Sequence, residues 1–395
     1  YDAREIAIWR GAKENALVLL GSATPSVESM YRAKQNIYRL YTLRRRYNGR
    51  PLPEVDIVDM KEELKMGNDL SLSYPLREAI HDNLKADKQT ILLLNRRGNS
   101  RALVCVDCRK SPECPRCSNR LTFHSANSRL MCHYCGHSTR VVQRCPSCGG
   151  PLKPLGAGTQ KIQEALEFEF PDTPVLRMDA DTVSAVNTHE KLLDRFKNEK
   201  IPILIGTQMV AKGLNLPDVT LVGVLDADLS LYADSYRAAE TTFNMLTQVV
   251  GRAGRGDTAG RAMIQTMVPN HKVIELAAKQ DYDSFYEGEI ALRRELSYPP
   301  FCDMVQLTVT GSVEREVLAA SAELSEAIIS RIKGEYSSLP FTVFGPFEAP
   351  VYRLDNKFRM RMVVKCVLNK RSRALFAELL SLFQRQGDNT PLLSV

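Results

Sequence analysis

Eight of the ten cysteines occur as Cys-x-x-Cys pairs within one short segment: Cys105, Cys108, Cys114, Cys117, Cys132, Cys135, Cys145 and Cys148. Two-residue spacing lets both thiolates of a pair face one metal ion, whereas a secreted disulfide framework spreads its cysteines through a small domain. Four thiolates close a tetrahedral zinc site and leave no open position for a substrate. The cysteines therefore predict two structural Zn²⁺ ions that fold the segment. A redox dithiol or an iron–sulfur site is the alternative reading of these thiols.

Loop lengths favour one pairing of these cysteines. Cys114, Cys117, Cys132 and Cys135 have the C-x2-C-x14-C-x2-C spacing of a zinc ribbon and are assigned to one ion. Cys105, Cys108, Cys145 and Cys148 are then left to share a second ion, nested outside the first. A sequential pairing, which would confine the chain to loops of five and nine residues, is the less favoured alternative.

The cysteine segment has little net charge once metal is bound. Between Val104 and Gly150 there are seven Lys/Arg residues and two acids, and eight thiolates with two Zn²⁺ ions bring the total to about +1. Such a module is a poor electrostatic clamp for DNA. We therefore expect it to contact a protein partner or to wedge a duplex apart.

Apolar runs of strand length surround this segment, at residues 16–20, 90–94, 201–205 and 222–225. An apolar run that enters a loop and then a helix is typical of a buried parallel strand. After the first run, Ser22 and Thr24 could position a phosphate or couple a nucleotide site to a neighbouring groove, and a helix cap is the equally favoured alternative. Residues 156–160 are expected to open a helix with Ile162, Leu166 and Phe168 on its apolar face.

Two arginines in a glycine-rich loop carry the clearest signal of catalysis. The run QVVGRAGRG, residues 248–256, is expected to end a helix and enter a loop. It places Arg252 and Arg255 three residues apart, where two guanidinium groups could contact the oxygens of a γ-phosphate.

The C-terminal hundred residues are expected to form strands at 304–309 and 341–344, with an amphipathic helix at 314–332. From Lys357 the chain alternates cations with apolar residues, which places Lys357, Arg359 and Arg361 on one face of a strand. Eight Lys/Arg residues and one acid lie between positions 353 and 373. A basic stripe of this kind favours contact with DNA phosphates, and an edge strand protected by charge is the alternative.

Taken together, GSATPS, the four cysteine pairs after LNRRG, ILIGTQMVAKGLNLPDVTLVGVLDAD and QVVGRAGR resemble superfamily 2 helicases. Within that superfamily they resemble the bacterial replication-restart helicases of the primosomal protein N′ (PriA) family, over essentially the whole chain. The resemblance implies ATP-dependent 3′ to 5′ translocation on DNA, unwinding at stalled or abandoned forks, and primosome assembly with loading of the replicative helicase. It also implies branched and single-stranded DNA, single-strand DNA-binding protein and other primosome proteins as partners.

The resemblance assigns roles residue by residue. Ser22, Ala23 and Thr24 match the motif that couples the ATP site to DNA. Thr207 and Gln208 match contacts to single-strand phosphate, and Gly213 matches a position that closes on nucleotide. Arg96 and Arg97 of the NRRG run are also predicted to bind DNA. Gln248, Arg252 and Arg255 match the arginine motif, with Arg255 as arginine finger and Arg252 as γ-phosphate sensor. Arg373 matches an arginine that binds the tail of single-strand DNA-binding protein.

The expected architecture is α/β: a RecA-like helicase lobe, in which helices flank a parallel sheet, with an inserted double zinc ribbon and a small C-terminal α/β domain. The predicted divisions are the end of lobe 1 (1–41), an interlobe linker (42–56), lobe 2 (57–103 and 151–297), the zinc insertion (104–150) and the C-terminal domain (298–395).

The sequence contains no Gly-x-x-x-x-Gly-Lys-Ser/Thr and no Asp-Glu-x-His, which such motors need to hold ATP and Mg²⁺. We therefore expect a C-terminal fragment that does not hydrolyse ATP alone. A non-catalytic zinc-ribbon scaffold that recruits replication proteins is the alternative function. No apolar run approaches ~20 residues, and the net charge is a mild +7. We expect a bacterial cytoplasmic, nucleoid-associated protein.

Overall fold

The computed structural model describes residues 2–43, 52–68, 71–94, 100–105, 107–108, 110–115, 121–124, 129–131, 137–154, 159–178, 186–207, 216–231, 233, 235–254, 259–383 and 391–395. The chain divides into two compact units, Tyr1–Arg45 and Arg46–Val395. None of the helices in the described ranges is both long and apolar enough to cross a membrane.

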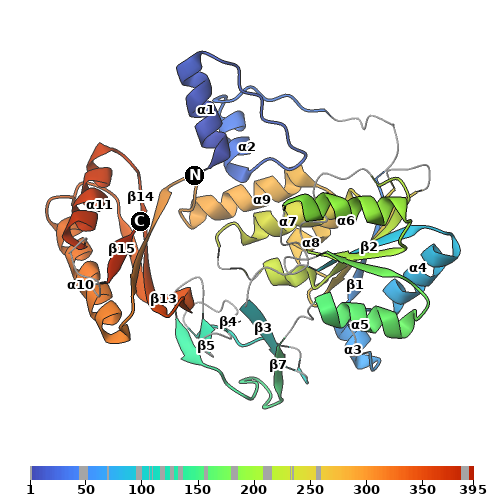
Figure 1. Cartoon of the computed structure of the whole chain (residues 1–395). Coiled ribbons are helices and arrows are strands. Elements are labelled where there is room, and N and C mark those ends of the chain that lie inside the picture. The colour runs from blue at the N-terminus through green and yellow to red at the C-terminus, as the bar shows by residue number, and fades with distance from the viewer. Residues whose placement is uncertain are drawn as a thin grey trace. The chain divides into compact units, whose positions relative to one another are not determined.

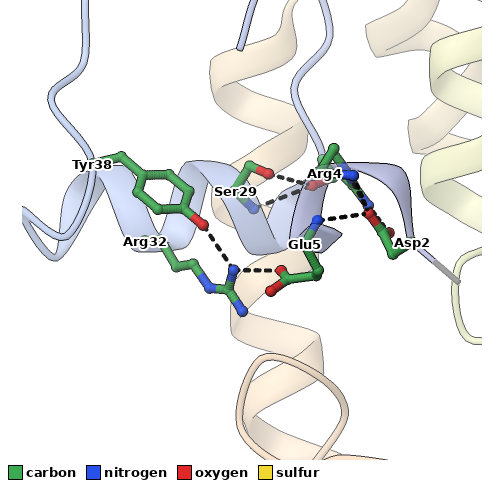
Figure 2. Close-up of polar contacts among 7 residues, drawn as sticks. Asp2, Arg4, Glu5, Ser29, Arg32 and Tyr38 are labelled. Carbon is green, nitrogen blue, oxygen red and sulfur yellow. Dashed lines mark hydrogen bonds and ion pairs between the residues drawn. The ribbon is translucent and has the colours of Figure 1, made fainter. Parts of the chain in front are cut away.

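The first unit contains two helices, α1 (Ala3–Glu14) and α2 (Val27–Lys34). Asp2 caps α1 by accepting a hydrogen bond from the backbone N–H of Arg4 at 2.8 Å. Figure 2 shows how one guanidinium then ties the unit together: Arg32 Nη1 donates to Glu5 Oε1 at 2.5 Å and to the Tyr38 hydroxyl at 2.8 Å. This group therefore links α1, α2 and the segment that follows α2.

The strand predicted at residues 16–20 is wrong. These residues form no strand, and Leu17 and Leu19 are 96% and 86% exposed. A parallel strand is stable only beside hydrogen-bonded neighbours, and every described strand of this chain lies beyond residue 53, outside the first unit. The helix predicted to follow from Val27 is confirmed as α2.

Six parallel strands form the central sheet of the second unit, in the order β1-β11-β10-β2-β9-β8. They are β1 (Glu54–Asp59), β2 (Gln89–Leu94), β8 (Val175–Met178), β9 (Ile203–Gly206), β10 (Val219–Leu225) and β11 (Arg261–Thr266). Every residue of β2, β9 and β10 is buried. This confirms the three apolar runs as parallel strands covered on both faces.

Helices cover both faces of this sheet (Figure 1). α4 (Tyr74–Lys85) and α5 (Thr159–Glu169) pack on one face, in a core that includes Leu76, Ile162 and Leu166. α6 (Val186–Asn198) and α7 (Ala238–Val250) contact β8 and β10 from the other face. The remaining helices of this part are α3 (Met60–Lys65), η2 (Ala227–Ser230), α8 (Lys272–Ala278) and α9 (Tyr282–Glu295).

One residue of the predicted apolar face of α5 was placed wrongly. Phe168 is 87% exposed, whereas Ile162 and Leu166 are fully buried. Two residues along a helix turn the side chain through about 200°, so Phe168 points away from the face that holds Leu166.

The cysteine segment forms a five-stranded sheet of order β6-β5-β4-β3-β7, whose neighbouring strands are antiparallel. Its strands are β3 (Ser100–Cys105), β4 (Thr122–His124), β5 (Arg129–Met131), β6 (Ser138–Arg140) and β7 (Leu152–Pro154). The buried core that the described residues give this sheet consists of Leu103, Cys114, Leu121 and Leu130.

The C-terminal domain is a four-stranded antiparallel sheet of order β13-β14-β12-β15. Its strands are β12 (Asp303–Gly311), β13 (Thr342–Leu354), β14 (Lys357–Cys366) and β15 (Leu392–Ser394). α10 (Glu314–Lys333) and α11 (Lys370–Phe383) pack on one face through a shared apolar core. The chain is therefore the α/β protein predicted: a RecA-like parallel sheet, a cysteine-rich insertion after β2 and a small C-terminal α/β domain.

Candidate metal centre and motor turn

The structure brings four of the paired cysteines together. The Sγ atoms of Cys105, Cys108, Cys145 and Cys148 lie within 4.8 Å of one another, with 3.4 Å between Cys105 and Cys148 and 3.5 Å between Cys108 and Cys145. Thiolates at ~2.3 Å from a tetrahedral ion lie about 3.8 Å apart, so this set fits one Zn²⁺. It is the set that the nested pairing assigns to one ion, and the sequential pairing would divide it between two.

Backbone pairing positions these four sulfurs. β3 ends at Cys105, which pairs with Leu152 of β7, and this register brings the first knuckle beside the last one. Within the knuckles, the Cys105 N–H donates to the Lys110 carbonyl at 2.9 Å, and the Cys145 N–H donates to the Gly150 carbonyl at 2.7 Å. The sheet and the tight turns therefore arrange the ligands together.

Cys145 lies in surroundings that favour its thiolate. Burial raises the pKa of the Cys145 thiol, but the backbone N–H groups of Ser147 and Cys148, together with the Cys108 and Cys105 thiols, outweigh burial and lower that pKa to about 6. The Ser147 N–H nitrogen lies 3.4 Å from the Cys145 sulfur. Because metals bind the thiolate and compete with its proton, this position favours metal capture near neutral pH.

The second set of cysteines is described at one position. Cys114 is buried in the small core with Leu103, Leu121 and Leu130. The other three, Cys117, Cys132 and Cys135, lie outside the described residues. Two Zn²⁺ ions per chain therefore stay a prediction.

The predicted motor arginines follow α7. Gln248 is exposed in the last turn of that helix, and Arg252 lies half-buried in the turn that comes next. The Gly254 N–H donates to the Val219 carbonyl at 3.2 Å, which ties this motor turn, residues 251–254, to the amino end of β10. Arg255 lies outside the described residues.

Gly254 cannot be replaced without moving the motor turn. Its φ is +69°, and a Cβ atom there would lie 2.7 Å from Gly260 Cα, a backbone atom. We expect Gly254→Ala to lower the free energy of unfolding by about 1–3 kcal/mol, measured by urea denaturation, because it adds left-handed strain to this clash.

Gly288→Ala is the matched control for that substitution. Gly288 lies within α9, where the nearest atom to an added Cβ is Lys272 Nζ at 3.9 Å. Alanine should stabilise the helix there by about 0.5–1 kcal/mol. Equal urea midpoints for the two variants would contradict the role assigned to Gly254.

Thr207 and the motor turn lie at opposite ends of the strands of the parallel sheet. Thr207 follows β9 directly, and its N–H donates to the last residue of β8 at 3.3 Å, at the carboxyl ends of the strands. The motor turn lies at the amino end of β10.

Five predicted site residues of the motor lobe are outside the described ranges: Arg96, Arg97, Gln208, Gly213 and Arg255. Their assignments stay predictions.

Ser22 and Thr24 form a local turn in the first unit. The Thr24 N–H donates to Ser22 Oγ at 3.1 Å, and Thr24 is buried. The cap of α2 is Ser26, whose Oγ accepts from the Ser29 N–H at 3.2 Å. The helix-cap alternative for Ser22 and Thr24 is therefore wrong, and their coupling role, shared with Ala23, stays a prediction.

The basic alternation near the C-terminus is confirmed as a strand. Met360 and Met362 of β14 enter the core beneath α10 and α11, so the intervening cations lie on the other face of the sheet. β14 lies between β13 and β12. The edge-strand alternative is therefore wrong, because β14 is an interior strand.

The predicted DNA-contacting cations differ in exposure. Lys357 is exposed, Arg359 is half-buried, and Arg361 is 7% exposed with its guanidinium over the Phe347 ring at 5.2 Å. In this arrangement phosphates can reach Lys357 and Arg359 more readily than Arg361. Arg373 is exposed in the first turn of α11, where a partner could contact it.

Sequence reasoning missed a buried ion cluster. Arg293 in α9 is 1% exposed, and its guanidinium contacts Glu240 Oε2 and Glu289 Oε1, each at 2.8 Å. Glu289 and Arg293 stand four apart on one helix, a signal visible in the sequence. Glu240 comes from α7, and only the fold shows that it faces the other two.

Comparison with known families matches three parts of the chain. Residues 294–395 match the family described as primosomal protein N C-terminal domain, and residues 157–257 match the helicase conserved C-terminal domain. Residues 114–140 match the PriA DNA helicase Cys-rich region domain. These matches cover the antiparallel C-terminal sheet, the part of the lobe with the motor turn, and β4 to β6 of the cysteine-rich sheet.

Curated relatives align with nearly the whole chain. The replication restart protein PriA of Bacillus subtilis is 42% identical over 98% of this chain and 48% of its own length. The protein of that name from Synechocystis is 40% identical over 92% of this chain and 44% of its own length. The chain thus spans about half the length of the curated relatives it matches. With the parallel sheet, the cysteine cluster and the three matching families, these identities show that the chain belongs to the PriA family.

Proposed function

We propose that these residues serve an ATP-dependent DNA helicase that acts at stalled or abandoned replication forks. In this proposal it moves 3′ to 5′ on DNA and starts primosome assembly and loading of the replicative helicase. The observation that carries the proposal is the motor turn: a half-buried arginine, Arg252, held by glycine geometry at the end of α7 in a RecA-like lobe. Paired arginines at such a turn suit contacts to a γ-phosphate.

The roles of the motor residues follow from this proposal. Arg252 would sense the γ-phosphate, Arg255 would act as arginine finger, and Gln248 would contact the same site. ATP with Mg²⁺ supplies the phosphate charge that these guanidinium groups stabilise. Thr207, which lies at the carboxyl ends of β8 and β9, and Gln208 would contact DNA phosphate.

DNA contacts from the C-terminal domain would come first from Lys357 and Arg359, which the sheet exposes most. Arg373 would receive an acidic segment of single-strand DNA-binding protein, because it is exposed in a helical first turn with Lys370 and Arg371 nearby. The relatives named replication restart protein support a setting at replication forks.

The cysteine module would be structural. Its four clustered thiolates would fill the coordination sphere of one Zn²⁺, and a second ion is proposed for Cys114, Cys117, Cys132 and Cys135. A tetrahedral ion with four protein ligands has no open position for substrate. The module would therefore act as a rigid wedge or docking surface.

A direct test measures ATP hydrolysis and strand separation on a forked duplex, using the complete gene product that contains these 395 residues. DNA-stimulated hydrolysis with strand separation is the expected result. DNA and partner binding without hydrolysis would instead support the zinc-ribbon scaffold. The isolated 395 residues carry no P-loop and should not hydrolyse ATP, so a DNA-stimulated rate from them would contradict the proposed division of roles.

A further inference from the structure

A layered contact connects the lobe that carries the motor turn to the C-terminal sheet. Four side chains make it: Arg293 of α9, Tyr236 just before α7, Tyr298 between α9 and β12, and Lys365 of β14. We define these four residues as the joint. Short contacts fix each layer against the next.

The first layer is the buried guanidinium. Arg293 bridges Glu240 in the first turn of α7 and Glu289 of its own helix. Burial lowers the pKa of Arg293, but the two carboxylates more than offset burial and raise that pKa, so the group stays charged. A buried, charged arginine between two carboxylates holds α7 and α9 in one arrangement, because separating them would leave buried charges unpaired.

The next layers are two aromatic rings. The Arg293 guanidinium lies 5.1 Å from the centroid of the Tyr236 ring. Tyr236 stacks on Tyr298 with 5.5 Å between centroids and 12° between ring planes. The Tyr298 N–H also donates to the Arg293 carbonyl at 2.8 Å. Stacked rings and cation–ring contacts of this geometry are attractive and directional.

The last layer comes from the C-terminal domain. Lys365 Nζ lies 3.8 Å from the Tyr298 centroid and donates to the Leu296 carbonyl at 2.7 Å. Lys365 stands on β14, the strand that also carries Lys357 and Arg359, and these odd-numbered residues share one face of the sheet. The joint therefore ends on the face that presents the proposed DNA contacts.

α7 connects the joint to the motor turn. Glu240 lies in the first turn of α7 and the motor turn follows its last residue, about 18 Å away at 1.5 Å per residue. Phe243, Leu246 and Val250 bury the helix against its neighbours. A helix held along its length in this way transmits a displacement of its first turn to its last.

We propose that the joint holds the C-terminal sheet and the motor lobe as one rigid body and couples DNA contact on β14 to the motor turn. Tyr236, Tyr298, Arg293 and Lys365 are positioning residues, because they act on Arg252 through α7 and touch no substrate. The rigid-body part stands on the contacts alone, and the coupling part rests on the proposed helicase function.

Distance distributions between two spin labels test the rigid body in the 395-residue chain. Non-natural amino acids would place the labels at Glu78 of α4 and Glu323 of α10, which are both exposed. Tyr298→Leu, which removes the ring, and Lys365→Met, which removes the ammonium, should broaden the narrow distribution of the unsubstituted chain. Tyr298→Phe keeps the ring, and Lys333→Met removes an exposed cation of α10, so both controls should leave it narrow. A broad distribution in the unsubstituted chain, or equal widths in all variants, would overturn the joint.

DNA-stimulated ATP hydrolysis by the complete gene product tests the coupling. Tyr298→Leu and Lys365→Met should reduce stimulation by DNA roughly tenfold, with the rate in the absence of DNA and the KM for ATP retained. If these variants broaden the spin-label distance distribution but leave the stimulation of ATP hydrolysis by DNA unchanged, the coupling is overturned and the rigid-body part of the proposal stands. Absence of ATP hydrolysis in the unsubstituted protein would overturn the proposed helicase function and the coupling with it. The distance distributions would then still test whether the joint holds the two parts as one rigid body.

Discussion

Arg252→Lys in the complete gene product should lower the turnover of DNA-stimulated ATP hydrolysis by roughly 10²–10³-fold, the effect of losing one preorganised donor to charge that develops in the transition state. Lysine keeps the positive charge but offers a single ammonium, whereas arginine presents a planar fork that can contact two phosphate oxygens. The KM for ATP should change much less than the turnover, because the retained charge still attracts the ground-state nucleotide. Steady-state hydrolysis at saturating DNA is the measurement.

Arg261→Lys is the matched control for this substitution. Arg261 begins β11, is exposed, and pairs with Asp56 at 2.7 Å, so it lies in the same lobe without a role in the motor turn. Its turnover should remain within about twofold of the unsubstituted protein, since exposed ion pairs contribute little. If the Arg252 and Arg261 variants have equal turnover and equal urea midpoints, the role of Arg252 in contacting the nucleotide is wrong.

Cys145→Ser should release one Zn²⁺ per chain and unfold the cysteine module. The buried Cys145 sulfur lies 3.5 Å from Cys108 and carries the lowered thiol pKa in the cluster. Serine is a poor zinc ligand, and structural zinc contributes about 10–16 kcal/mol of apparent binding free energy that is also folding free energy. Metal analysis should give one ion per chain in place of two. Amide hydrogen exchange should show lost protection in β3 and β7 with the six-stranded sheet retained.

Cys302→Ser provides the comparison for the zinc experiment. Cys302 is half-buried in the second unit, outside the Cys-x-x-Cys pairs, and its thiol donates to the Ser297 carbonyl at 3.0 Å. This variant should keep its zinc content and the protection of β3 and β7. One ion or none in the unsubstituted chain would overturn the two-site assignment. If Cys145→Ser retains its full zinc content, the assignment of Cys145 as a zinc ligand is wrong.

Local patterns predicted several strands and helices of the second unit. The runs that became β2, β9 and β10 are continuous apolar stretches, and such stretches are stable only when a sheet buries both faces. The alternation from Lys357 predicted β14, because a strand turns successive side chains to opposite faces. The apolar run at 16–20 forms no strand. Its composition suits a buried strand, but a strand also needs neighbours, and the residues around it provide none in the described part of the first unit.

The candidate site was predictable wherever its chemistry is local. Thiol spacing predicted a metal cluster, because it depends on residues a few positions apart, and the phosphate contact predicted from GRAGR stays a prediction. Loop lengths favoured Cys105, Cys108, Cys145 and Cys148 as one ligand set, and the pairing of β3 with β7 places their sulfurs together.

Residue types and their spacing by themselves determined the α/β class, the zinc chemistry, the arginine motif and the basic strand. The tertiary structure alone decided that Arg361 is buried with its guanidinium over the Phe347 ring while Lys357 is exposed, and that Arg293, Tyr298 and Lys365 meet in one joint. The physical reason is one of range. Periodicity and metal-ligand spacing act over a few residues, whereas burial of a charge and contact between residues 53 or 67 positions apart depend on how whole sheets and helices pack.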